Sequence, residues 1–147
     1  MPPVSRPPRT RRWGTFPTTA DVGIWATATT ADGLLEALGL GLFAVMIPLR
    51  TVRPLDQRAI SASGSDASEL VVAFLTELIV LQSSEGFLVR DLRVRSVGSP
   101  PTSLVAAATG EPFDPARHAV RTEVKAATFH ELLFDPARHR ARVIVDI

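Results

Sequence analysis

Two segments with helical periodicity, each preceded by a strand pattern, most constrain how this chain can fold. Apolar residues recur at helical spacing over residues 34–46, where Pro48 stops the run, and over residues 70–81, after which Gly86 is placed for a C-cap. Only strand patterns follow, which differs from the regular alternation of a doubly wound sheet. We therefore predict a single α+β domain in which two helices pack on one face of a largely antiparallel or mixed β-sheet.

Strands are expected where short apolar runs or apolar–polar alternation replace the helical spacing. These segments are residues 22–28, 58–63, 87–97, 104–109, 120–128 and 142–147. Capping boxes are expected at Thr29-x-x-Asp32 and at Asp66-x-x-Glu69. Gly39 and Gly41 each lower the helix propensity of the first helix by about 1 kcal/mol. Burial of a broad apolar face, or close packing of the backbone, must offset that cost.

The composition is that of one ordinary globular domain. The chain has 147 residues, of which 46% are hydrophobic and 21% are charged. It has no cysteine, which excludes disulfides, thiolate catalysis and Cys-ligated metal sites and fits a reducing compartment. The longest charge-free apolar stretch, residues 37–49, is shorter than the about 20 residues of a membrane-spanning helix, and no secretory signal pattern is present. We expect a soluble cytoplasmic protein with no membrane partner.

The net charge of +1 is unevenly distributed along the chain. Arg6, Arg9, Arg11 and Arg12 are four of the 16 basic residues, which leaves 12 basic against all 15 acidic residues after position 12. Because four prolines lie among these arginines, we predict a flexible Pro/Arg-rich arm over residues 1–13 and a domain over residues 14–147. RNA contact and the lack of any function are both open for such an arm.

Local sequence motifs of catalysis are missing from the chain. It has no P-loop, no dinucleotide-binding fingerprint, no zinc-protease motif and no serine-hydrolase elbow. His118, His130 and His139 are too dispersed for a local metal motif, so we expect polar surface or turn positions for them. The hexapeptide Phe-Asp-Pro-Ala-Arg-His occurs twice, at residues 113–118 and 134–139. Its Asp-Pro step favours a type I turn, and we interpret both copies as the same turn before a strand.

Carboxylates near the two ends of the domain are the main candidates for a metal site. Asp21 precedes an apolar strand pattern, where it either accepts hydrogen bonds from local backbone N–H groups or acts as a ligand. Asp146 is followed at once by the α-carboxylate of Ile147, and these charges repel unless a cation or solvent neutralises them. Oxygen donors alone select a hard cation such as Mg²⁺ or Ca²⁺.

Lys125 is the single lysine among 16 basic residues. The alternation places it in the middle of a strand on the same face as Glu123. This position is typical of an exposed ion pair. A lysine here also suits a functional site that needs a compact ammonium group instead of a guanidinium group.

Six segments, in order along almost the whole domain, resemble the archease family. They are Thr19-Ala-Asp-Val-Gly-Ile24, Leu42-Phe-Ala-Val-Met46, residues 70–77 with Phe74-Leu75-x-Glu77, Phe113-Asp-Pro-Ala-Arg-His118, residues 122–130 with Thr-Glu-Val-Lys-Ala-x-Thr-Phe-His, and Val143-Ile-Val-Asp-Ile147. The resemblance implies an archease-like α+β fold. It also implies an accessory protein that activates RtcB-type RNA ligases, which join tRNA halves in tRNA splicing and repair broken RNA.

The resemblance also implies which residues form the site. Asp21, Asp146 and Ile147 match the family's metal ligands, and Lys125 matches a lysine that is important for activation. The implied metal is a divalent cation, Ca²⁺ in the first place and Mg²⁺ or Mn²⁺ as alternatives.

Three further residues are expected around this site, namely Thr18, Glu123 and His130. The sequence departs from the family pattern at Pro17 and Thr18, where the family usually has an acidic residue and a histidine. An imidazole is therefore lost beside the expected site, which changes the hydrogen bonding around the ligands.

Three functions compete on this evidence. The first is a non-catalytic activator that promotes guanylylation and multiple turnover of an RtcB-type ligase and meets RNA only through that ligase. The second is a small metal-dependent hydrolase using Asp21, Asp146 and Lys125, but no nucleophile or histidine base stands with them in a recognisable arrangement. The third is a nucleic-acid-binding module that uses the basic arm, which the mildly acidic remainder of the chain disfavours.

Overall fold

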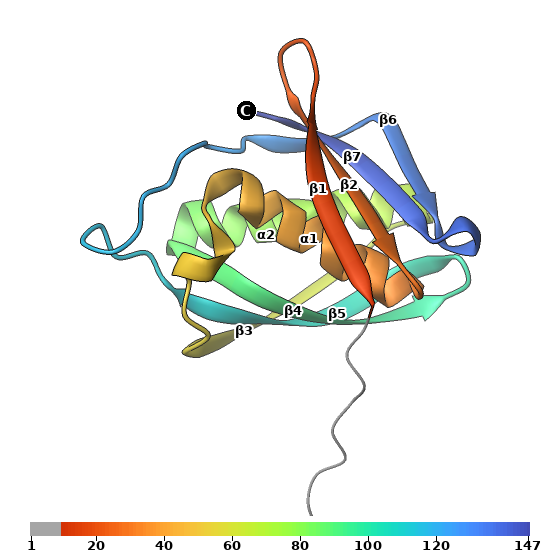
Figure 1. Ribbon diagram of the computed structural model, residues 1–147. Helices are drawn as coiled ribbons and strands as arrows, with labels where there is room; N and C mark the ends of the chain where they lie inside the picture. The colour runs from red at the N-terminus through yellow and green to blue at the C-terminus, as the bar shows by residue number, and fades with distance from the viewer. Residues whose placement is uncertain (1–9) are drawn as a thin grey trace, which may run out of the picture.

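Two antiparallel β-sheets enclose a pair of helices in the computed structural model, which describes residues 10–147 (Figure 1). One sheet has the strand order β1-β2-β7-β6 and the other has the order β3-β5-β4. The strands are β1 (Arg11–Pro17), β2 (Val22–Ala28), β3 (Asp56–Ser63), β4 (Phe87–Gly98), β5 (Pro101–Pro112), β6 (Ala126–Asp135) and β7 (Arg140–Asp146). The helices are α1 (Ala31–Met46) and α2 (Ala67–Glu85), and short 3-10 turns occupy Leu49–Thr51 and Pro136–Arg138.

The predicted α+β class, with two helices packed on antiparallel strands, is confirmed. Where one sheet was expected, the strands form two sheets that cover the helices from opposite sides. α1 lies between β1 and β2 on one side and β4 on the other, and α2 lies between β6 and the sheet of β3, β5 and β4. The core is therefore the helical layer, with one face of each sheet turned toward it.

Two glycines of α1 allow both sheets to approach this helix closely. A Cβ atom at Gly39 would lie 2.5 Å from Leu92 Cδ1 of β4. A Cβ atom at Gly41 would lie 2.5 Å from Ile24 Cγ2 of β2, which belongs to the other sheet. Close packing of the backbone, one of the two explanations offered by the sequence, thus accounts for both residues.

The ends of α2 form as the sequence predicts. The carboxylate of Asp66 accepts a hydrogen bond of 2.8 Å from the backbone N–H of Glu69. In return, the Glu69 carboxylate accepts one of 2.8 Å from the backbone N–H of Ser65, so the reciprocal pattern of a capping box is present one residue out of place. Gly86 ends the helix in the left-handed region at φ 65°.

The start of α1 differs from the predicted capping box. The N-cap is Thr30, whose Oγ1 accepts a hydrogen bond of 2.9 Å from the backbone N–H of Gly33. Asp32 consequently does not form the reciprocal hydrogen bond of a capping box with the start of the helix. Its carboxylate accepts a hydrogen bond of 3.0 Å from the backbone N–H of Ser96, which attaches the start of α1 to β4.

The boundary predicted for the basic arm is wrong, because strand β1 already begins at Arg11. The Arg11 guanidinium donates hydrogen bonds to the carboxylates of Glu36 and Asp91 and to the carbonyl of Leu92. Glu36 is fully buried in α1, and a buried carboxylate requires such a partner. Trp13 also packs against the core. The rest of the predicted arm, residues 1–9, lies outside the described residues.

The strand expected over residues 120–128 is also misplaced. Residues 113–125 form a connection without strand structure, and β6 begins only at Ala126. The hairpin to β7 decides this boundary, because its register pairs Ala126 with Asp146 and Asp135 with Arg140. The other expected strands coincide or overlap with observed ones.

Helix α2 is long and apolar enough to span a membrane by length and composition alone. Its apolar residues Leu70, Phe74 and Leu78 are fully buried in the core. A core helix of this kind has the same apolar character as a membrane span. Packing between the two sheets therefore accounts for the hydropathy of α2.

Candidate functional site

Asp21 and Asp146 lie next to each other across two paired strands. Val22 of β2 and Val145 of β7 form the last pair of this antiparallel ladder, and continuing the same register places Asp21, in the turn before β2, opposite Asp146. Directly opposed residues in such a ladder have Cβ atoms about 4.5–5.5 Å apart. The fold therefore brings together two carboxylates that are 125 positions apart in the sequence of 147 residues.

Both carboxylates have oxygen atoms available for a ligand. The Asp21 backbone is held in a tight turn, in which its N–H donates to Thr18 Oγ1 at 3.1 Å and its carbonyl accepts from Thr18 N–H at 3.4 Å. Both carboxylate side chains are half-buried. Within residues 10–147, neither of them accepts a hydrogen bond or forms an ion pair. Thr18, which replaces the histidine of the family pattern, thus positions the loop that carries Asp21.

Lys125 lies immediately before β6, not in the middle of a strand. Its backbone N–H donates a hydrogen bond of 2.8 Å to the carbonyl of Asp146, which places Lys125 beside the end of β7. Its side chain is exposed, and in the described part of the chain it forms no ion pair with Glu123. The structure thus brings the backbone of Lys125 to the end of β7 that carries Asp146.

A pocket of about 430 Å³ adjoins Asp21. Its lining comes from the β1–β2 turn, from β6 and from β7, and includes Phe16, Thr18, Asp21, His130 and Ile144. His130, one of the residues expected around the site, lines the same pocket as Asp21. No group of three or more His, Asp or Glu side chains that could hold a metal is found within residues 10–147. A cation at this site would need the α-carboxylate of Ile147 or a partner's groups besides the two aspartates.

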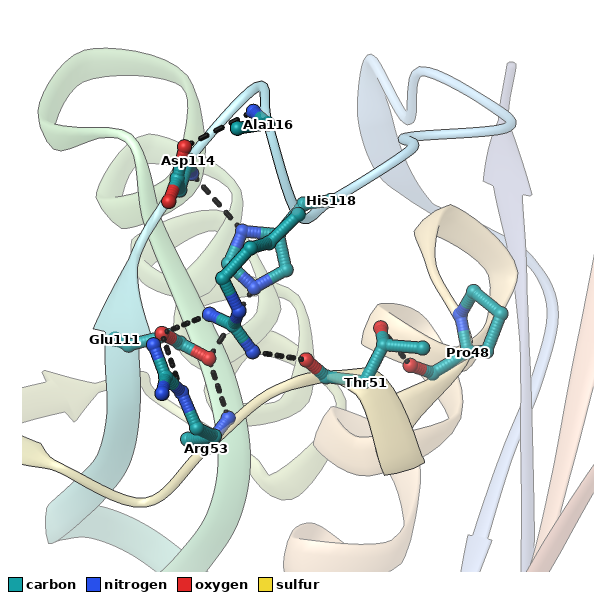
Figure 2. Close-up of polar contacts among 8 residues, drawn as sticks. Pro48, Thr51, Arg53, Glu111, Asp114, Ala116 and His118 are labelled. Atoms are coloured by element: carbon teal, nitrogen blue, oxygen red, sulfur yellow. Dashed lines mark hydrogen bonds and ion pairs between the residues drawn. The ribbon is translucent and has the colours of Figure 1, made fainter.

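A second polar cluster, which the sequence did not predict, surrounds Glu111 at the end of β5 (Figure 2). The Glu111 side chain is 6% exposed and accepts hydrogen bonds from the backbone N–H of Arg53 and from the guanidinium of Arg117 at 2.7 Å. Nε2 of buried His118 lies 3.2 Å from the same carboxylate. His118 was expected at a surface or turn position; it does end a turn, but it is buried instead of lying at the surface.

The hydrogen bonds of His118 fix its tautomer. Nδ1 accepts a hydrogen bond of 2.9 Å from the backbone N–H of Asp114, so Nδ1 carries no proton. Nε2 therefore carries the proton and donates it to Glu111. A neutral imidazole thus links the turn at residues 114–118 to the strand that precedes it.

The charge of Glu111 is stabilised in spite of its burial. Desolvation raises the pKa of this carboxyl group, but the hydrogen bonds from Arg53, Arg117 and His118 outweigh that effect. The resulting pKa is lowered from 4.5 to about 2. Glu111 therefore acts as a structural ion that fixes the long connection from β5 to β6.

Of the two copies of the hexapeptide, only the second fulfils both parts of the prediction, a turn and a strand that follows it. The first copy forms a turn with a buried histidine but is followed by a connection. The second forms the 3-10 turn Pro136–Arg138 between β6 and β7, where Asp135 caps the turn and exposed His139 adopts φ 58°. The same six residues therefore occupy two environments that only tertiary packing distinguishes.

A solved structure with this architecture defines the class of protein. The solution structure of Methanobacterium thermoautotrophicum protein 1598 superposes with a TM-score of 0.72 at 27% sequence identity, covering 92% of this chain and 98% of that one. This chain is thus a small α+β domain of the same type, with two helices between antiparallel sheets.

The sequence comparisons identify the family within that class. The model of the Archease protein family (MTH1598/TM1083) matches residues 13–147. The archease of Thermococcus gammatolerans is 38% identical over 83% of this chain and 87% of its own length. That of Methanopyrus kandleri is 33% identical over 92% of this chain and 99% of its own length. The chain belongs to the archease family, whose members are accessory proteins of RNA ligation and tRNA processing.

Proposed function

We propose that this protein activates an RtcB-type RNA ligase in the cytoplasm. In this role it promotes guanylylation of the ligase histidine and multiple turnover in tRNA splicing or RNA repair, and it performs no catalysis of its own. The observation that carries the proposal is the opposition of Asp21 and Asp146 across β2 and β7. Membership of the archease family leads us to expect ligase activation, and the opposed carboxylates offer a site suited to that role.

The proposal includes a divalent cation, Ca²⁺ in the first place, held by Asp21, Asp146 and the α-carboxylate of Ile147. The donor set fits, because two adjacent carboxylates without hydrogen-bond partners among residues 10–147 repel each other unless a cation lies between them. Oxygen-only donors favour a hard cation over a transition metal. When bound, such an ion supplies positive charge next to the phosphates of a nucleotide held by the partner.

Lys125, the residue before β6, completes the proposed site. Its backbone bond to Asp146 fixes its position beside the ligands, while its exposed side chain is directed by no ion pair of the described residues. We infer that its ammonium group contacts a phosphate or a ligand oxygen of the docked ligase. Thr18 and His130 shape the pocket next to Asp21 and take no part as ligands.

The test uses the whole protein with a purified RtcB-type ligase, GTP and a broken RNA substrate. We expect Asp146→Asn to abolish stimulation of histidine guanylylation and of multiple-turnover ligation while circular dichroism stays unchanged. Asp56→Asn is the matched control, because Asp56 is an exposed carboxylate at the start of β3 in the other sheet. Full stimulation by Asp146→Asn, or an equal loss with Asp56→Asn, would overturn the site.

A further inference from the structure

Two aromatic rings lie flat against glycines on the outer face of the β1-β2-β7-β6 sheet. The indole of Trp25 covers Gly14 on the paired strand, since three ring atoms lie 2.5–2.6 Å from the place of a Cβ atom there. The ring of Phe16 covers Gly23 in the same way, with three atoms at 2.1–2.4 Å. Each ring thus packs one face on the sheet and turns its other face outward. Both side chains are half-buried, as this arrangement requires.

Three exposed arginines border these rings. Arg142 of β7 is the direct cross-strand partner of Trp25. The next row along the sheet holds Arg12 and Arg140, which both pair with Thr27. No carboxylate of residues 10–147 lies within ion-pair distance of these three guanidinium groups, although Arg142 Nε donates to the carbonyl of Glu131 at 3.0 Å. Their positive charge is therefore available to a partner.

The rings and arginines form one line that ends at the carboxylate pair. Because outward-facing residues repeat every second position, the arginine row is followed by the Trp25 row and then by the row of Phe16 and Gly23. The next outward-facing row contains Asp21 and Asp146. No described helix or strand covers this face of the sheet (Figure 1). We call the surface made by Arg12, Phe16, Trp25, Arg140 and Arg142 the aromatic face.

We propose that the aromatic face binds single-stranded RNA directly, with bases stacked on Trp25 and Phe16 and phosphates held by the arginines. Aromatic rings on an open sheet surface stack unpaired bases, and flanking guanidinium groups neutralise the backbone. A duplex offers no free base faces, so its binding would use the arginines alone. An acidic protein segment would pair with the arginines but would gain nothing specific from flat ring faces.

This inference goes beyond the proposed activation of a ligase, in which RNA is met only through that partner. It gives the protein its own contact with the RNA strand whose end is being processed. The line of rows would direct that strand from the arginines toward the carboxylate pair. Because the contact needs no ligase, it can be tested on the whole chain alone.

The experiment measures fluorescence anisotropy of a fluorescein-labelled, unstructured RNA oligonucleotide against the full-length protein over a range of salt concentrations. We expect Trp25→Leu to weaken binding about tenfold or more, because Leu keeps an apolar side chain but cannot stack. Trp25→Phe is expected to retain most of the affinity. Arg142→Ala is expected to weaken binding and to lower the slope of log K against log salt by about 0.7.

Arg95→Ala is the matched control, because Arg95 is an exposed arginine on β4 of the other sheet. It is expected to change neither the affinity nor the salt slope. Thermal unfolding of every variant separates lost binding from lost folding. Equal binding by Trp25→Leu and wild type, equal losses in Arg142→Ala and Arg95→Ala, or a preference for duplex RNA would each overturn the proposal. So would a Trp25→Leu variant that loses ligase docking but keeps RNA affinity, which would make this face a protein interface.

Discussion

At the scale of single residues, Glu111 shows how a buried charge can hold a long connection in place. The Glu111→Gln change keeps the shape of the side chain but replaces one acceptor oxygen with an amide donor, which then opposes a donor of the cluster. We expect the free energy of unfolding at pH 7 to fall by about 3 kcal/mol. Urea unfolding followed by circular dichroism measures this loss. A variant as stable as the wild type would show that the cluster contributes nothing.

The same carboxylate predicts how stability depends on acid. The pKa of Glu111 is about 2 in the folded protein against a reference value of 4.5, so the unfolded chain binds the proton more readily. The stability contributed by Glu111 is therefore complete above about pH 4.5 and declines as the pH falls toward 2. Urea midpoints measured between pH 7 and 3 are expected to fall less in Glu111→Gln than in the wild type. Parallel curves for the two proteins would contradict the shifted pKa.

Lys125 leads to a prediction about the kind of positive charge that the site needs. The remaining 15 of the 16 basic residues are all arginine, so charge alone gives no reason for a lysine at position 125. A guanidinium is planar and larger, and its donors form a rigid fork. We therefore expect Lys125→Arg to reduce ligase stimulation almost as much as Lys125→Ala, measured as guanylylation and multiple turnover at equal concentrations. If the arginine variant matches the wild type while the alanine variant fails, only charge is required.

At the scale of elements, the packing of α1 between the two sheets explains why this helix contains glycine. Gly39 costs helix propensity, yet the side chains of Leu92 and Leu78 occupy the space that a Cβ atom would need. We expect Gly39→Ala to destabilise the protein by about 1–3 kcal/mol, because overcrowding outweighs the gain in propensity. Thr76→Ala on the exposed side of α2 is the control and is expected to be neutral or stabilising. The urea midpoints of the two variants are expected to move in opposite directions or, at the least, to differ clearly.

Hydrophobic periodicity predicted the helices and strands that have a clear apolar spacing of their own. It failed where contacts with residues distant in the sequence set the boundaries of an element. Both helices and most strands follow from spacing, and the cap at Asp66 follows from local hydrogen bonding. β1 was assigned in part to an arm because arginines and prolines look unfolded, whereas Arg11 is bound by buried Glu36 of α1. The start of β6 depends on pairing with β7, and no local signal marks it. His118 is buried while its copy His139 is exposed, which the identical hexapeptides cannot distinguish.

The candidate site shows the same limit. The family resemblance implied one site for Asp21, Asp146 and Lys125, but residue types and spacing alone did not show that the two ends of the domain lie side by side, which the strand register does. The sequence did not indicate the aromatic face, because no strand was predicted at Phe16 and Trp25 is an ordinary residue of the strand expected over 22–28. Only the pairing of each ring with a glycine on the neighbouring strand shows that they lie flat.

At the scale of the whole molecule, ion pairs of one arginine connect the layers. Arg11 of β1 joins Glu36 of α1 and Asp91 of β4, so one guanidinium links both sheets through the helix between them. The opposed carboxylates at the far end of β2 and β7 have no such internal partner among the described residues. This difference separates a charge that serves the fold from charges that are available for a ligand.

We therefore expect the stability of the whole protein to depend on whether a cation is bound. A ligand that binds only the folded state stabilises it by about 2.7 kcal/mol at a free concentration one hundred times its Kd. For a domain of this size, that corresponds to a rise in Tm of about 5–10 °C. We expect this rise when Ca²⁺ is added to EDTA-treated protein, and we expect Asp146→Asn to abolish it. Without the cation, Asp146→Asn is expected to unfold at or slightly above the wild-type temperature, because it removes the repulsion between two adjacent carboxylates.

Scanning calorimetry at constant ionic strength, with Na⁺ in place of Ca²⁺ as the control, separates binding from screening. An equal rise in the variant would show that Ca²⁺ acts elsewhere on the surface, and no rise in either protein would remove the calcium site.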